Sequence, residues 1–148
     1  MSLSILKNVK LADYTSWLIG GPAENFCLPT SLQEIREALK YAEDHQLKTT
    51  VIGGGSNILI SDKGFKGLVI GLRKFSETKS EIKNDRIFIE CLAGSSKSEL
   101  LKIFLKNQLG PALFLAGLPG DVGGGVVMNA GVAEAFHPRE FMELVDRI

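Results

Sequence analysis

Two glycine-rich stretches constrain the fold of this chain more than any other feature of its sequence. The first is VIGGGSNILI at residues 51–60, and the second is AGLPGDVGGGVVMNAG at residues 116–131. Glycine inside a regular element costs conformational entropy, so a folded protein keeps such runs where the backbone needs unusual torsion angles or a close approach. Both stretches are therefore predicted to be loops that serve a binding site.

The composition limits the classes of partner. The 148 residues suit one compact unit, or two small subdomains that share an interface. Lys plus Arg and Asp plus Glu each number 17 without long blocks of one sign, so nucleic acid is not an expected partner. No apolar run reaches the roughly 20 residues of a membrane span, and no secretory signal pattern is present. A cytoplasmic location without membrane contact is expected.

The first half of the chain predicts a strand, a helix and two further strands. A short strand covers residues 23–29, and a helix runs from Ser31 to about His45. Ser31 and Glu34 have the spacing of a capping box. The stretch KTTVIGGGSNILI is predicted to be a strand that opens into a loop and resumes, and GFKGLVIGL to be another strand. The residues predicted to form the buried face of the helix are Leu32, Ile35, Leu39 and Ala42.

The second half repeats this order without repeating the residues. ETKSEIKNDRIFIECLAG predicts two strands that meet at a turn around Asn84 and Asp85. Ser96 and Glu99 again have capping-box spacing, and Gly110 with Pro111 closes the predicted helix. Its apolar face is predicted from Leu100, Ile103 and Phe104. A hairpin between two helices favours an α+β fold over a doubly wound parallel sheet.

The first glycine run is suited to an anion. Backbone N–H groups of residues 53–57 can form a concave nest around a phosphate. A Walker loop is excluded because no lysine follows the glycines, and a Rossmann loop lacks its GxGxxG spacing. The second run, around Pro119 and Asn129, suits a flat ring that side chains would obstruct. Tight turns alone are the simpler explanation for any single Gly-Gly pair.

Other catalytic patterns are weak. The nucleophile elbow GxSxG is absent around Ser56. His45 and His137 are interpreted as surface or capping residues, and Cys27 and Cys91 as buried free thiols without the spacing of a metal site. We therefore predict neither a catalytic residue nor a metal ligand in this chain.

The motifs IGGPAENF at 19–26, VIGGGSNILISDKGFKGLVI at 51–70 and AGLPGDVGGGVVMNAG at 116–131 resemble a known family. They are similar to the amino-terminal flavin-binding part of the UDP-N-acetylenolpyruvoylglucosamine reductases, also called UDP-N-acetylmuramate dehydrogenases. The resemblance implies an FAD-binding fold of the vanillyl-alcohol-oxidase/PCMH type, with two α+β subdomains, residues 1–72 and 73–148. It further implies FAD as cofactor, NADPH as hydride donor and a UDP-sugar substrate of peptidoglycan precursor synthesis.

The resemblance also implies two groups of cofactor-binding residues. Those that match the segment around the FAD diphosphate are Gly53, Gly54, Gly55, Ser56 and Asn57. Those that match the segment beside the flavin are Gly117, Leu118, Pro119, Gly120, Gly123 and Gly124, followed by Asn129, Ala130 and Gly131.

The chain departs from the family pattern in two respects. Val132, Ala133 and Glu134 replace the Ala-Tyr-Gly that many relatives have after the second motif. The family's catalytic Arg, Ser and Glu match no residue here, so the 148-residue chain alone is expected to be inactive. Two other interpretations remain open at this point: a flavin-dependent alcohol or sugar oxidase of the same fold, and a non-catalytic flavin-binding module that acts with a partner chain.

Overall fold

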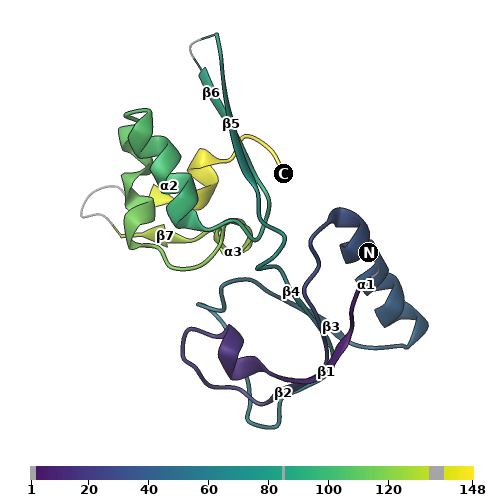
Figure 1. Cartoon of the computed structure of the whole chain (residues 1–148). Coiled ribbons are helices and arrows are strands. Elements are labelled where there is room, and N and C mark those ends of the chain that lie inside the picture. Colours follow the sequence, from purple (N-terminus) through teal and green to yellow (C-terminus); the bar gives the residue numbers. More distant parts are fainter. Residues whose placement is uncertain (1–2, 85, 134–138) are drawn as a thin grey trace. The chain divides into compact units, whose positions relative to one another are not determined.

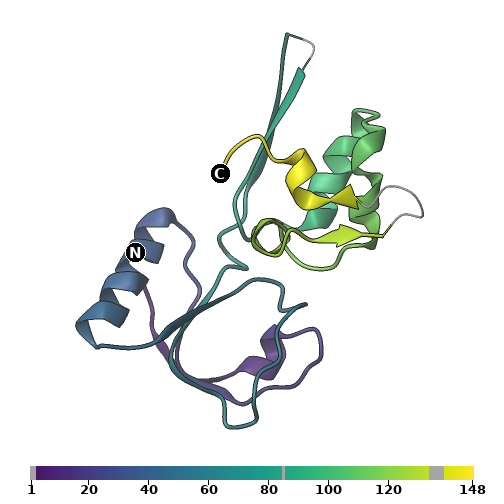
Figure 2. The same ribbon diagram turned by 180° about the vertical axis from the view of Figure 1, so that it is seen from behind.

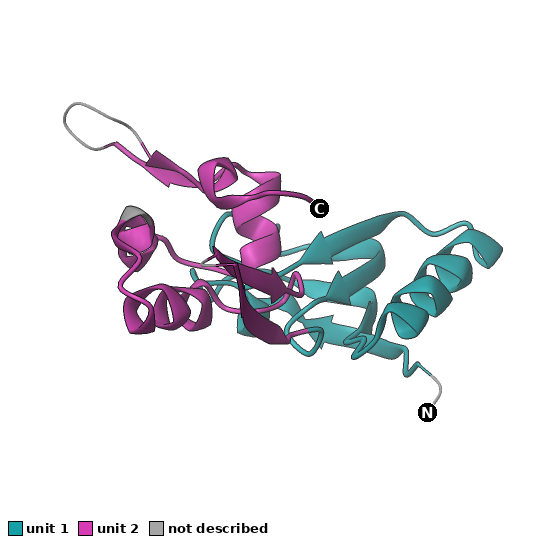
Figure 3. Ribbon diagram, turned by 90° about the horizontal axis from the view of Figure 1, so that it is seen from above, with its two compact units in different colours: residues 1–75 teal, residues 76–148 magenta. Residues whose placement is uncertain are grey.

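The computed structural model describes residues 3–84, 86–133 and 139–148, and it consists of two compact units, Met1–Phe75 and Ser76–Ile148 (Figure 3). The sequence placed the subdomain boundary slightly earlier, between residues 72 and 73. That the two units act as FAD-binding subdomains stays a prediction. The predicted turn residue Asp85, and Glu134 and His137, lie outside the described residues.

Unit 1 is built on a four-stranded mixed sheet (Figures 1 and 2). Its strands are β1 (Leu6–Lys10), β2 (Pro22–Cys27), β3 (Thr49–Ile52) and β4 (Phe65–Gly71). The spatial order is β1-β2-β4-β3, with β1 antiparallel to β2, and with β4 parallel to both β2 and β3. Helix α1 (Leu32–Asp44) covers one face of this sheet. The 3-10 helix η1 (Leu11–Tyr14) contributes to the core on the other face.

Helix α1 begins where the sequence predicted, but only part of its predicted apolar face is buried. Ala38 and Ala42 are buried against Leu68 and Ile70 of β4, whereas Leu39 remains 49% exposed. Leu32, also predicted to be buried, is 54% exposed. Alanine side chains let the helix lie close to the sheet, and at that short distance the larger leucines project past the contact. The predicted face is therefore confirmed at Ala42 and wrong at Leu32 and Leu39, while Ile35 is half-buried.

The predicted capping box of α1 is only half formed. The Ser31 hydroxyl accepts a hydrogen bond from the Glu34 N–H at 3.2 Å. The Glu34 carboxylate does not return a bond to Ser31, because it accepts hydrogen bonds from the N–H and hydroxyl of Thr30, at 2.6 and 2.8 Å. These two bonds lower the pKa of Glu34. The cap therefore spans one more residue than the pattern predicts.

The strand predicted to resume after the first glycine run does not do so. No strand occurs between β3 and β4. Instead the segment bonds to the chain that precedes β2: Ser16 N–H donates to the Gly55 carbonyl at 3.0 Å, and Gly21 N–H donates to the Ser61 carbonyl at 2.9 Å. Residues 53–64 thus form a long loop fixed along the segment 15–21.

Unit 2 combines a hairpin with short helices around a small core. Its elements are β5 (Thr78–Lys83), β6 (Arg86–Cys91), α2 (Lys97–Lys106), the 3-10 helices η2 (Gly110–Gly117) and η3 (Phe141–Leu144), α3 (Val122–Val127), β7 (Gly131–Val132) and β8 (Arg139–Glu140). The hairpin β5–β6 extends beyond the helices of this unit (Figures 1 and 2). The buried core consists of Leu100, Ala112, Phe114, Leu115, Val122 and Phe141.

Several predictions for unit 2 are confirmed and one is wrong. The hairpin is present with Asn84 at φ 50° in its turn, and the capping box of α2 is complete, with reciprocal bonds between Ser96 and Glu99. The glycine run that was predicted to be a loop forms helix α3 instead. The α+β class is confirmed, since both units mix helices with strands and no doubly wound sheet is formed.

Candidate functional site

The first candidate segment, residues 53–57, leaves the carboxyl end of β3. Gly55 has φ +69°, a left-handed conformation that favours glycine. A Cβ atom at this position would collide with the carbonyl oxygen of Tyr14 and would lie 2.8 Å from the Cα atom of Thr15. Gly55 is therefore required by the fold itself, because it lets the loop pass directly against the end of η1.

The same loop presents unused hydrogen-bond donors. Within the described residues, no backbone N–H group of residues 53–57 donates to a protein acceptor, and the side chains of Ser56 and Asn57 form no hydrogen bond. Gly53, Gly54 and Ser56 are half-buried and Asn57 is exposed. Successive free amides beside a residue with positive φ are the components of an anion-binding nest. This geometry is suited to a phosphate or diphosphate.

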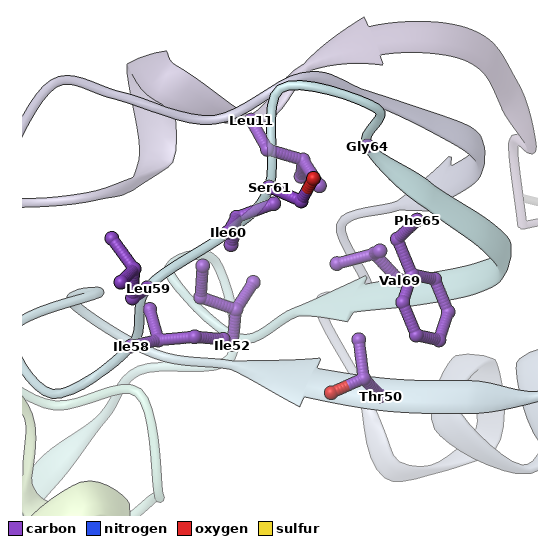
Figure 4. A pocket seen from close by; sticks show the side chains of 10 residues that line it. All are labelled: Leu11, Thr50, Ile52, Ile58, Leu59, Ile60, Ser61, Gly64, Phe65 and Val69. Atoms are coloured by element: carbon purple, nitrogen blue, oxygen red, sulfur yellow. The ribbon is translucent and has the colours of Figure 1, made fainter.

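A cavity of about 170 Å³ borders this loop (Figure 4). It is lined by Leu11, Thr50, Ile52, Ile58, Leu59, Ile60, Ser61, Gly64, Phe65 and Val69. The hydroxyl groups of Thr50 and Ser61 are its only side-chain polar groups. A cavity of roughly 150 Å³ accommodates a ring the size of benzene, so this one is too small for the three fused rings of a flavin. We assign it no part of a cofactor ring.

In the second candidate segment, two of the three consecutive glycines face the protein interior. A Cβ atom on Gly123 would lie 2.8 Å from Cβ of Ala93, and one on Gly125 would lie 2.7 Å from the ring of Phe141. At Gly124 a Cβ atom would meet nothing within 4 Å. Gly123 and Gly125 therefore permit close packing of α3, and Gly124 is the glycine of this run that leaves the surface open.

The residues before α3 are partly accessible. Gly117 and Pro119 are exposed, Leu118 and Gly120 are half-buried, and Gly120 has φ +92°. The carbonyl groups of this turn are held from inside, because Lys97 Nζ donates to the Pro119 carbonyl at 2.8 Å. The turn thus offers a surface with little side-chain bulk, which suits a flat ligand.

Asn129, Ala130 and Gly131 connect α3 to the last segment of the chain. The Asn129 side chain donates to the Glu140 carboxylate at 2.6 Å and accepts from the Met142 N–H at 3.1 Å. The Ala130 carbonyl accepts from the Phe141 N–H at 2.9 Å. A Cβ atom on Gly131 would collide with the carbonyl oxygen of Arg139 across the β7–β8 pair. These contacts explain the motif structurally, and its contact with a cofactor stays a prediction.

Lys97 is a structural residue of this segment that the sequence analysis missed. Its side chain is buried, it lies over the ring of Phe141 at 5.8 Å, and its backbone N–H donates to the Gly120 carbonyl. Burial lowers the pKa of Lys97, and the nearby Asp121 carboxylate opposes that shift. A signal was available: Lys97 is the first residue of α2, where the helix dipole disfavours a cation.

The predicted site residues form two groups in different units, residues 53–57 in unit 1 and residues 117–131 in unit 2. His45 caps the end of α1, where its Nδ1 atom lies 2.8 Å from the Tyr41 carbonyl oxygen, so the interpretation as a capping residue is confirmed. Cys27 is buried, but Cys91 is only half-buried. The described residues contain no group of three potential metal ligands. None of the helices they form is long and apolar enough to cross a membrane.

Comparison with known proteins identifies the family of this chain. The family described as FAD binding domain matches residues 23–144. UDP-N-acetylenolpyruvoylglucosamine reductase of Prochlorococcus marinus is 38% identical over 133 residues, which are 90% of this chain and 45% of that protein. The reductase of the same name from Desulforamulus reducens is 41% identical over 128 residues, 86% of this chain and 41% of its own length.

A solved structure shows the same arrangement of elements. The crystal structure of UDP-N-acetylenolpyruvylglucosamine reductase from Thermus caldophilus matches 95% of this chain and 46% of its own, with a TM-score of 0.66 and 27% sequence identity. The chain thus spans less than half the length of the relatives that it matches.

Proposed function

This chain belongs to the family of FAD binding domains, and we propose that it is the FAD-binding part of a UDP-N-acetylenolpyruvoylglucosamine reductase. One observation carries the proposal: the loop 53–57 is locked against η1 by Gly55 and keeps its backbone donors unused. The reductases that share 38% and 41% identity with most of this chain supply the reaction class. The proposed location is the cytoplasm.

The residues present fit FAD in two places. The unused amides of residues 53–57 would hold the diphosphate, assisted by the Ser56 hydroxyl and the Asn57 amide. The surface of Gly117, Leu118, Pro119 and Gly120, together with Gly124, would lie along the flavin ring, because no side chain obstructs it at Gly124. Asn129, Ala130 and Gly131 would hold this surface in place through their bonds to residues 140–142.

FAD held by these residues would supply hydride-transfer chemistry, with NADPH as the hydride donor and the enolpyruvyl group of the UDP-sugar as the proposed acceptor. The contribution of this chain is to bind and orient the cofactor. Backbone donors at residues 53–57 would hydrogen-bond to the diphosphate, and the buried Lys97 fixes the Pro119 carbonyl from the interior. No residue of this chain is assigned to proton transfer, and we expect the 148-residue chain alone to lack reductase activity.

Visible absorbance of the purified chain, before and after addition of FAD, tests the proposal directly. We expect flavin bands near ~450 nm at about one flavin per chain. Substitution Gly54→Val should abolish FAD binding with little change in far-UV circular dichroism, because its side chain would occupy the place of the diphosphate. Gly110→Val is the matched control, since a Cβ atom at Gly110 meets nothing within 4 Å. Unchanged FAD affinity in Gly54→Val would contradict the assignment of this loop.

A further inference from the structure

The carboxyl ends of β3 and β4 bring Arg73 next to the glycine loop. Ile52, the last residue of β3, pairs with Gly71, the last residue of β4. The ladder continues one step further, because the Leu72 N–H donates to the Ile52 carbonyl at 2.9 Å. Gly53 and Arg73 therefore leave the sheet from adjacent parallel strands. Ligands of open sheets bind at this end of parallel strands.

The Arg73 side chain is held in place although it is exposed to solvent. Its guanidinium carbon lies 4.8 Å from the centroid of the Tyr14 ring, and its Nη1 atom donates to the Asp13 carbonyl at 3.2 Å. The Tyr14 ring is anchored in turn against Phe26 in the core, with 4.5 Å between ring centroids. An arginine ordered in this way loses less conformational entropy when it binds an anion than a free surface lysine would.

Tyr14 also connects Arg73 to the loop. The backbone of Tyr14 and Thr15 is the surface against which Gly55 lies, and the next residue, Ser16, donates its N–H to the Gly55 carbonyl at 3.0 Å. The guanidinium and the free amides of residues 53–57 are thus supported by the same turn of chain. Among the described residues, Arg73 forms no ion pair with a carboxylate.

We propose that Arg73 supplies the positive charge of the diphosphate site whose backbone donors are residues 53–57. The inference rests on the proposed function, because it assigns a further binding residue to the same site. From the sequence, only residues 53–57 were predicted to hold the anion, and no cationic side chain was assigned to it. A guanidinium complements such a nest, since it forms charge-assisted and often bidentate hydrogen bonds with phosphate oxygens.

The experiment measures FAD affinity of the 148-residue chain carrying Arg73→Gln, Arg73→Lys or Lys74→Gln. Lys74 is the control, because it is the adjacent exposed cation and acts on Glu34 rather than on Tyr14. We expect Arg73→Gln to weaken FAD binding about tenfold and to reduce its dependence on salt. Arg73→Lys should recover part of the affinity, and Lys74→Gln should change it less than about twofold.

Riboflavin and inorganic pyrophosphate separate the charge from a structural role. Riboflavin lacks phosphate, so its affinity should be equal in the wild-type chain and in Arg73→Gln, whereas pyrophosphate should compete with FAD less effectively in that variant. Equal weakening of FAD and riboflavin, or equal effects of Arg73→Gln and Lys74→Gln on FAD, would overturn the proposal. If the wild-type chain binds pyrophosphate through Arg73 but no FAD, the anion site stands and the proposed function fails. If it binds neither ligand, both fail.

Discussion

The two glycine segments of this protein have similar compositions and different physical roles. In unit 1, Gly55 adopts a left-handed conformation that a larger residue would strain, and the loop around it leaves its amides free. In unit 2, Gly123 and Gly125 lie within a helix, and their missing side chains let α3 pack against Ala93 and Phe141. Their N–H groups bond to protein carbonyls, at 2.8 Å to Ala93 and 2.9 Å to Asp121.

The difference shows that a glycine run can either allow a left-handed backbone conformation or allow neighbouring groups to pack closely. The backbone N–H groups of the first segment stay unpaired because the strand ends there and no other described residue completes the ladder. The second segment uses most of its polar groups in its own fold, and among its three consecutive glycines only Gly124 has open space beside it. The proposed cofactor binding at the second segment would therefore depend on shape more than on backbone donors.

The largest expected loss of stability follows substitution of Gly55, the glycine with a left-handed backbone conformation. Gly55→Ala should destabilise unit 1 by about 3 kcal/mol, because the new Cβ atom needs both a left-handed backbone and space that the Tyr14 carbonyl occupies. Urea unfolding, with hydrogen exchange followed separately in the two units, measures this loss. Gly110→Ala, where the space is open, is the control. A loss below about 1 kcal/mol would show that the loop is not fixed by Gly55.

Smaller changes in stability, of opposite sign, are expected for substitutions at the neighbouring residues Gly124 and Gly125 of α3. Gly125→Ala should cost unit 2 about 2 kcal/mol, since its Cβ atom would lie 2.7 Å from the Phe141 ring and 2.9 Å from Cε of Lys97. Gly124→Ala should stabilise the unit by about 0.5–1 kcal/mol, because alanine favours a helix and meets no neighbour. Thermal unfolding of both variants measures the contrast. Equal shifts in the two variants would refute the packing role.

The smallest expected effect is on the dependence of stability on alkaline pH. Burial raises the pKa of Cys27 in unit 1 from 9.0 to about 11. The stabilisation from the protonated Cys27 thiol is therefore complete below pH 9 and is lost as the pH rises towards 11. By pH 10 this loss is about 1 kcal/mol. Burial lowers the pKa of Lys97 in unit 2, so the unfolded chain binds this proton more tightly than the folded chain. The free energy that Lys97 contributes to folding therefore rises with pH until the pH reaches the pKa of Lys97 in the unfolded chain.

Urea unfolding of the wild-type chain, Cys27→Ala and Lys97→Met at pH 7.5 and pH 10 tests both signs. Relative to the wild-type chain, Cys27→Ala should lose less stability on the change to pH 10, and Lys97→Met should lose more. Comparison within each variant removes the constant cost of the substitution itself. An unchanged pH dependence in either variant would mean that its side chain does not titrate differently in the folded and unfolded states.

Local signals in the sequence predicted much of the fold. Ser31 and Ser96 marked the starts of α1 and α2 correctly, since an N-cap acts within one turn of chain. The hairpin turn at Asn84 was likewise predicted by local chemistry. The buried face of α1 was predicted only in part: Ala42 is buried as expected, but the leucine spacing gave no measure of how closely Ala38 approaches the sheet.

The candidate site also contains residues that local sequence patterns predicted and residues that only the structure identified. Residues 53–57 were predicted as an anion loop from glycine content alone, and the structure places them at a strand end with free donors. The role of Arg73 could not be predicted, since it depends on the ring of Tyr14, which is distant in the sequence. Lys97 had a local signal in its place at the start of α2, but its contacts with Phe141 and Pro119 could not be predicted. Local sequence patterns do not reveal contacts between residues that are far apart in the chain.

By itself, the sequence determined where α1 and α2 begin, where the hairpin turns and which two segments lack side chains, because each of these depends on torsion angles and bonds within a few residues. Only the tertiary structure decided which glycines adopt a special backbone conformation and which allow close packing. Helix propensity disfavours three glycines by about 1 kcal/mol each, yet contacts with Ala93, Lys97 and Phe141 hold 122–127 in a helix. Packing between distant residues outweighed local preference there, whereas in the loop 53–57 the close approach of Gly55 to Tyr14 and Thr15 leaves the backbone N–H groups without a partner among the described residues.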